Sequence, residues 1–210
     1  MKQFMYNVSE FGKRIVLTFT PFLVYYVAVL ILLAPPMSDL LSDFNEQRIK
    51  TAITKKILVK YCSDKKMAEL FIKVGRLYDI DPFFLCSVVS ANSNFEVNKI
   101  TEGEDGAKFL GLMQINAADY SKYQQKNLFD LEINLKLGAM ELRRAMDYGK
   151  GNMIKTLAVY YSDSVDLPNT KKYGQSTLDF IEHVRKFYSD IQRTQKLYIQ
   201  ENYDLFYGEK

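Results

Sequence analysis

The stretch YDIDPFFLCSVVSANSNF, residues 78–95, decides the fold. Asp81 followed by Pro82 is a typical helix start, because the aspartate caps free backbone N–H groups and proline suits the first helical position. The apolar run behind them predicts a buried helix that ends near residue 92. The run closes on two asparagines, Asn92 and Asn94, and asparagine at position 92 has two interpretations: a polar helix cap or a residue of a functional site.

Helical patterns surround this stretch on both sides. Helices are expected over residues 38–60 (one amphipathic helix or a pair), 64–78, 130–148 with Asp130 as its cap, 152–162 and about 175–192. Residues 96–116 contain three glycines and no stable period, so an ordered loop is expected there. No run alternates with period two for long enough to require a sheet, and the predicted fold class is therefore all-α. The tail, 193–210, is either a last helix or a frayed end.

The N-terminal part of the chain carries a different signal. Residues 15–34, IVLTFTPFLVYYVAVLILLA, contain no charged side chain. Twenty helical residues span about 30 Å, which is the thickness of the hydrocarbon core of a bilayer. Lys13 and Arg14 precede the run and favour a cytoplasmic location for residues 1–14. The prediction is a single-pass membrane anchor; a cleaved signal peptide and a buried core helix are the alternatives.

Charge and cysteine content exclude several classes of function. The chain holds 28 Lys and Arg against 25 Asp and Glu, a balance that gives no electrostatic footprint for nucleic acid. Cys62 and Cys86 could pair in an oxidising compartment, but Cys86 is better explained as a small buried apolar residue. His183, the only histidine, is interpreted as a surface or packing residue. No metal-ligand spacing is present, so neither a metal nor a cofactor is expected.

Five segments carry a family resemblance through their order. After residues 78–95 come GLMQIN (111–116), NLFDLEINLKLGAMELRRAMDYG (127–149), TLAVYYSDS (156–164) and STLDFIEHVRKFY (176–188). Together they resemble the soluble lytic transglycosylase (SLT) family, bacterial muramidase-like enzymes that share the fold of goose-type lysozyme. The resemblance implies a lysozyme-like helical domain, placed here at residues 61–192, that acts on the glycan strands of peptidoglycan.

The resemblance also implies a location. The anchor 15–34 would lie in the bacterial inner (cytoplasmic) membrane, followed by a juxtamembrane amphipathic helical segment, residues 35–60. The domain behind that segment would then face the periplasm or the wall.

The departures from the family pattern fall where its chemistry is done. The resemblance implies that one glutamate, at the end of the Asp-Pro helix, protonates the glycosidic oxygen and then deprotonates the sugar's own C6 hydroxyl. Asn92 occupies that position, and a carboxamide has no proton to give at ordinary pH. Leu178 stands at the family's arginine and Phe180 at its closing tyrosine. The expected glycan groove consists of Asn92, Ser93, Phe95, Met113, Gln114, Asn116, Tyr160, Tyr161 and Phe180.

Three hypotheses follow for the function. The first is a membrane-anchored protein that binds glycan strands without efficient cleavage and possesses no catalytic residue, a pseudoenzyme that could position a cell-envelope protein complex. The second is an active lytic transglycosylase in which another carboxylate, Glu96, Glu102 or Glu104, has taken over. The third is a protein–protein interaction module whose groove is defunct.

Overall fold

The computed structural model describes residues 37–103, 106–162 and 173–202. The chain divides into two units, residues 1–48 and residues 49–210. The predicted anchor, residues 15–34, lies outside the described residues. Among the helices that are described, none combines the length and the apolar character needed to cross a membrane.

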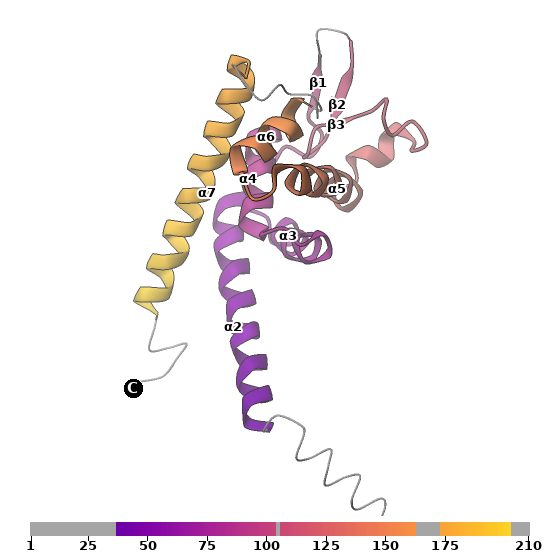
Figure 1. Ribbon diagram of the computed structural model, residues 1–210. Coiled ribbons are helices and arrows are strands. Elements are labelled where there is room, and N and C mark those ends of the chain that lie inside the picture. Colours follow the sequence, from indigo (N-terminus) through magenta and orange to yellow (C-terminus); the bar gives the residue numbers. More distant parts are fainter. Residues whose placement is uncertain (1–36, 104–105, 163–172, 203–210) are drawn as a thin grey trace, which may run out of the picture. The chain divides into compact units, whose positions relative to one another are not determined.

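Helices make up most of the described chain, as predicted. They are α2 (Met37–Cys62), α3 (Lys65–Tyr78), α4 (Pro82–Ser93), α5 (Leu131–Gly149), α6 (Met153–Ser162) and α7 (Gln175–Glu201), with a short 3-10 helix η1 (Gln125–Phe129) before α5 (Figure 1). α2 is one continuous helix rather than a pair. α7 continues to Glu201, so the first part of the tail is helical and the predicted end near residue 192 is too early.

Helix caps explain why α4 and α5 begin where the sequence predicts. The carboxylate of Asp81 accepts hydrogen bonds from the backbone N–H groups of Phe83 and Phe84, and Asp130 caps α5 in the same way. At the other end of α4 the cap is Asn94, in the left-handed conformation with φ 51°. The interpretation of Asn92 as the helix cap is therefore wrong, because this residue lies inside the last helical turn.

A small antiparallel sheet occupies the segment that was expected to be a loop. Its strands β1 (Ile100–Glu102), β2 (Lys108–Leu110) and β3 (Ile115–Asn116) pair in the order β1-β2-β3. The expectation of an all-α fold is wrong for this segment. Strands of two or three residues are too short to produce a period-two pattern. Which strands pair depends on how the chain that follows each strand folds back on it.

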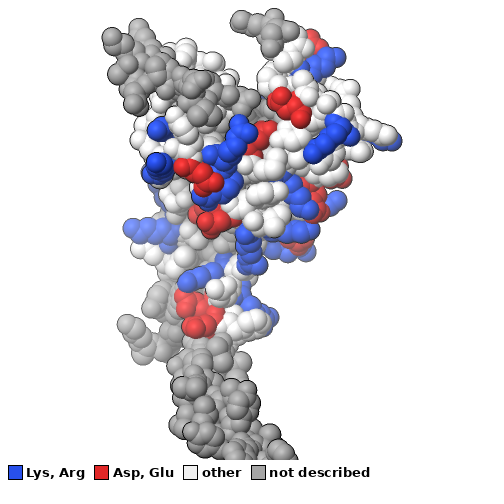
Figure 2. Space-filling model, turned by 45° about the vertical axis from the view of Figure 1, so that its right-hand side comes forward, with Lys and Arg blue, Asp and Glu red and all other residues white. Residues whose placement is uncertain are grey.

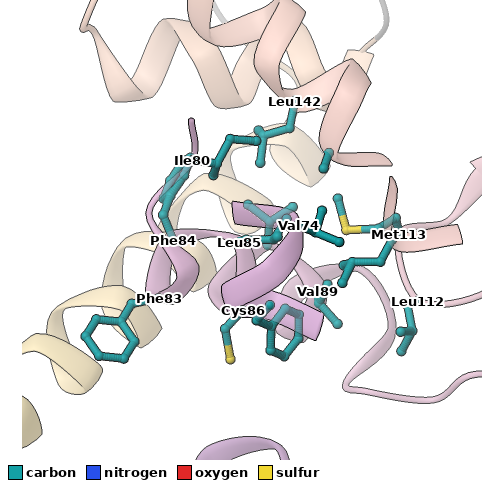
Figure 3. Packing of buried hydrophobic residues seen from close by; sticks show 14 of the residues in the cluster. Val74, Ile80, Phe83, Phe84, Leu85, Cys86, Val89, Leu112, Met113 and Leu142 are labelled. Carbon is teal, nitrogen blue, oxygen red and sulfur yellow. The ribbon is translucent and has the colours of Figure 1, made fainter. Parts of the chain in front are cut away.

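α4 lies at the centre of the hydrophobic core. Val74 from α3, Met113 from the loop before β3 and Leu142 from α5 pack around it, and Figure 3 shows these side chains converging on Leu85. Each such burial contributes about 1.5–3 kcal/mol. Cys86 is fully buried, which confirms its interpretation as a small apolar residue, and both thiols are free.

α7 closes the other side of this core. The ring of Tyr188 meets that of Phe84 edge-on at 5.6 Å between centroids, and the ring of Phe187 meets that of Tyr61 at 5.3 Å. His183 bonds Ser90 at 3.1 Å and stacks on Phe187, which agrees with a packing role. The helix that carries the candidate site is thus clamped between α7 and the α3–α5 layer.

Candidate functional site

One cavity of about 580 Å³ opens beside the last turn of α4. We call it the Asn92 pocket. Its walls come from α4, the small sheet, α5 and α6, and its lining residues are Ala91, Asn92, Lys99, Thr101, Gly103, Phe109, Met113, Gln114, Asn116, Asp119, Glu141, Arg144, Ala145, Val159, Tyr160, Tyr161 and Ser162.

Asn92 is held in this pocket by bonds at both its side chain and its backbone. Its Nδ2 donates to the Tyr160 hydroxyl at 3.1 Å, and that hydroxyl donates to the Met113 carbonyl at 3.3 Å. Lys99 Nζ donates to the Asn92 carbonyl oxygen at 2.7 Å, where an ammonium group suits the negative end of a helix. These bonds join α4, α6 and the two loop segments into one wall.

The phenol of Tyr160 stays neutral in this environment. Burial raises its pKa above the ordinary value, and the negative charge of Glu141 raises it further, whereas the hydrogen bond from Asn92 lowers it. The side chains of Asn92 and Tyr160 therefore present two neutral groups to the pocket, an amide and a protonated hydroxyl.

The loop that carries Met113 is fixed to α5 by one buried asparagine. Asn134 Nδ2 donates to the carbonyls of Leu110 and Leu128 at 2.8 and 2.7 Å, and its Oδ1 accepts from the Met113 N–H at 2.8 Å. Gly111, with φ +74°, leaves room for this amide, since a Cβ there would lie 2.4 Å from Asn134 Nδ2.

Gly138 makes the corresponding space on α5. A Cβ at this position would lie 2.4 Å from the Cβ of Met113. The close approach of α5 to the loop therefore requires glycine at position 138.

An aromatic surface forms one edge of the pocket. The ring of Tyr161 stacks on that of Phe180 at 4.7 Å with an interplanar angle of 29°, and Tyr161 remains 43% exposed. Phe180 is buried and does not itself line the pocket. A ring backed in this way is a suitable surface for the apolar face of a sugar.

The structure brings together six of the nine residues that were expected to form the groove. Asn92, Met113, Gln114, Asn116, Tyr160 and Tyr161 line the pocket, whereas Ser93, Phe95 and Phe180 do not. Ser93 is buried and bonds the Val89 carbonyl, and Phe95 packs on Phe187. Gln114 lines the pocket but donates its Nε2 to the Gly111 carbonyl at 2.7 Å, so it also supports the loop.

Of the three glutamates considered as replacement acids, Glu96 and Glu102 are not among the pocket residues. Glu96 is exposed beyond the end of α4, and Glu102 forms an ion pair with Lys108 at 3.7 Å on the exposed hairpin. Glu104 lies outside the described residues. The second hypothesis thus loses Glu96 and Glu102, and its third candidate, Glu104, stays a prediction.

Sequence reasoning missed the charged residues that do line the pocket. They are Lys99, Asp119, Glu141 and Arg144. Glu141, Arg144 and Ala145 follow i, i+3, i+4 spacing on α5, a signal that could have placed them on one face. Elsewhere, the face drawn in Figure 2 carries both basic and acidic side chains. Within the described ranges, no cluster of His, Cys, Asp or Glu could hold a metal ion.

These elements define a helical, lysozyme-like domain with a small sheet beside its cleft. The family model described as the transglycosylase SLT domain matches residues 69–179, more than half of the chain, and the chain belongs to this family. No curated protein matches it.

Among solved structures, the X-ray structure of an inactive mutant of the lytic transglycosylase Slt from Pseudomonas aeruginosa is similar, with a TM-score of 0.43 and 18% identity. The match covers 63% of this chain and 24% of that chain, so this chain spans about a quarter of that enzyme's length.

Proposed function

We propose that this protein binds the glycan strands of peptidoglycan in the Asn92 pocket without cleaving them efficiently. The observation that carries the proposal is the carboxamide of Asn92, which faces the pocket and bonds Tyr160 at 3.1 Å. Membership of the SLT family supports a peptidoglycan ligand.

The chemistry of the pocket suits binding better than cleavage. Cleavage in this family's manner needs a carboxylic acid at the end of the Asp-Pro helix, because the acid must first give and then take a proton. Asn92 and Tyr160 can each hydrogen-bond a sugar hydroxyl or acetamido group, but neither exchanges protons at neutral pH, and the pKa of the Tyr160 phenol is raised. The loss of general acid–base catalysis removes roughly 10²–10⁴-fold in rate.

We further propose that residues 15–34 anchor the protein in the bacterial inner membrane, with the SLT domain facing the periplasm or wall. The support is the charge-free run of twenty residues behind Lys13 and Arg14. A tethered binder of this kind would hold a cell-envelope protein complex against the wall. Proteolysis of intact and opened spheroplasts tests the orientation: we expect the domain to be cut in both, and protection in intact spheroplasts would contradict it.

One experiment tests both parts of the glycan proposal, which are the binding of glycan strands and the lack of efficient cleavage. The full chain, in mild detergent, is incubated with purified murein sacculi, the sacculi are sedimented, and the supernatant is analysed for anhydro-muropeptides by chromatography and mass spectrometry. We expect the protein in the pellet and no anhydro product above the buffer control. Release of product at the rate of an active lytic transglycosylase would overturn the proposal, and so would a protein that stays in the supernatant.

A matched pair of variants locates the binding. Asn92→Ala removes the amide from the pocket, whereas Asn98→Ala removes an exposed amide that does not line it. We expect weaker sedimentation of the first variant only.

A further inference from the structure

Glu141 is a carboxylate of the Asn92 pocket that the family resemblance does not assign. It lies on α5, is half-buried, and faces the same cavity as Asn92 and Tyr160. Arg144 and Ala145 share this face of the helix. The cavity thus has a neutral wall at Asn92 and Tyr160 and a charged wall on α5.

Tyr120 fixes the direction of this carboxylate. The Tyr120 hydroxyl donates to Glu141 Oε1 at 2.7 Å, from the segment between β3 and η1. Burial raises the pKa of Tyr120, and the hydrogen bond to Glu141 and its charge raise it further, so the phenol remains a donor at physiological pH. A half-buried side chain on a rigid helix with a permanent donor at one oxygen is pre-organised for a ligand.

We propose that Glu141 binds the hydroxyl and acetamido N–H groups of a glycan strand in this pocket, and that Tyr120 is its positioning residue. The inference rests on the proposed function and adds the group that recognises the sugar. A carboxylate has about four lone-pair sites, so it can accept hydrogen bonds from several donors at once. Hydrogen bonds to an ionised acceptor are roughly twice as strong as neutral ones, so Glu141 would be the strongest sugar acceptor on the α5 wall.

The geometry also separates this role from that of the missing acid. Glu141 is braced by a donor and belongs to α5, whereas the family's acid would stand at the end of α4. We therefore assign Glu141 to binding of the sugar and not to the role of that acid.

The test uses the full chain in mild detergent and two probes, murein sacculi in sedimentation and a soluble N-acetylglucosamine oligomer in calorimetry. Glu141→Gln keeps the shape and removes the charge. Glu132→Gln, on the same helix, removes an exposed charge that pairs with Lys73 and Lys136 outside the pocket. We expect Glu141→Gln to weaken binding of both probes by roughly 10-fold or more, and Glu132→Gln to leave it unchanged.

Tyr120→Phe tests the positioning role and also serves if Glu141→Gln does not fold. Alone it should weaken binding several-fold, by less than Glu141→Gln. In the Glu141→Gln background it should add nothing, because Tyr120 acts through the carboxylate. If Glu141→Gln and Tyr120→Phe both bind the probes as tightly as the wild type does, this inference is overturned while the proposed function stands. Failure of the wild type to bind either probe would overturn both.

Discussion

The side-chain nitrogen of Asn92 lies 3.1 Å from the hydroxyl oxygen of Tyr160, and the same hydroxyl reaches the Met113 carbonyl at 3.3 Å. Three segments that are distant in sequence therefore meet at the position where the SLT family resemblance expects an acid. The amide bonds two of these segments directly or through one hydroxyl, so the wall of the pocket depends on it.

Restoring the acid is the most direct test of this relationship. We expect Asn92→Glu to release anhydro-muropeptides from murein sacculi at least 10²-fold faster than the wild type, the low end of what general acid–base catalysis contributes. The low end is expected because the family resemblance implies that Leu178 and Phe180 stand at the positions of an arginine and a tyrosine. Asn92→Gln, of equal length but without an ionisable proton, is the control and should release none. Equal product from both variants would show that the pocket does not place the acid at the scissile bond.

The exposed ring of Tyr161 should contribute to glycan binding. Tyr161→Ala removes the aromatic surface that Phe180 supports. We expect binding of an N-acetylglucosamine oligomer to weaken by roughly 2- to 12-fold, as for an aromatic contact of about 0.5–1.5 kcal/mol. Tyr148→Ala, which removes a half-buried tyrosine that does not line the pocket, is the control. Calorimetric titration measures both, and a loss of equal size in the control would argue against a sugar-stacking role.

Asn134 should be far more important for stability than for chemistry. Asn134→Asp keeps the shape but loses both donors to the Leu110 and Leu128 carbonyls, so two buried acceptors lose their partner and a charge becomes buried. We expect a loss of about 3–5 kcal/mol in the free energy of unfolding, measured by urea denaturation followed by circular dichroism. The exposed Asn98→Asp should change it by less than about 0.5 kcal/mol. Similar losses in the two variants would contradict the bridging role of Asn134.

Gly138 and Met113 should be energetically coupled. Gly138→Ala places a methyl group 2.4 Å from the Met113 Cβ and should cost about 1–3 kcal/mol, while Met113→Ala leaves a cavity and should cost about 2–5 kcal/mol. We expect the double variant to lose at least 1 kcal/mol less free energy of unfolding than the two single variants lose together. The reason is that the added methyl group and the shortened Met113 side chain compensate for each other, which a double-mutant cycle measures. Urea denaturation of the four proteins tests this; strict additivity would be the contrary result.

The ion pairs of Glu132 give a pH dependence with a defined sign. Hydrogen bonds from Lys136 and Lys73 lower the pKa of Glu132 from 4.5 to about 2. Because the pKa is lower in the folded state, the contribution to stability is complete above pH 4.5 and is lost as the pH falls toward 2. We expect the small Tm difference between wild type and Glu132→Gln to be constant near neutral pH and to vanish near pH 2. A difference that does not change over this range would contradict the prediction.

The sequence was sufficient to locate the helices, because the signals that begin them are local. Asp81 and Asp130 cap α4 and α5 as predicted, since a capping side chain bonds N–H groups only two or three residues away. The sheet was missed because its pairing, such as Ile100 with Leu110, is determined by contacts beyond three-residue strands. The end of α7 was also missed, since Tyr198 gains support from Lys56, far away in the sequence.

The residues of the site also fall into two groups, those that the sequence predicts and those that only the structure reveals. Asn92 and Tyr160 belong to motifs whose order along the chain is informative, so they were placed in the pocket. Glu141 lies among ordinary helix-forming residues, and its partner Tyr120 belongs to another segment of the chain. Only the folded arrangement brings the two together at one wall. Conversely, Ser93 and Phe95 neighbour Asn92 in sequence but do not line the pocket. The helix directs Ser93 to another face, where it bonds the Val89 carbonyl, and Phe95, which follows the helix, packs on Phe187.

The burial of α4 on nearly every face has an evolutionary consequence. A substitution at Leu85 or Cys86 changes the packing of the core, whereas a substitution at Asn92 changes the lining of the pocket. The two effects fall on different side chains of one helix. The residue at position 92 can therefore be exchanged during evolution while the core that maintains the fold stays the same.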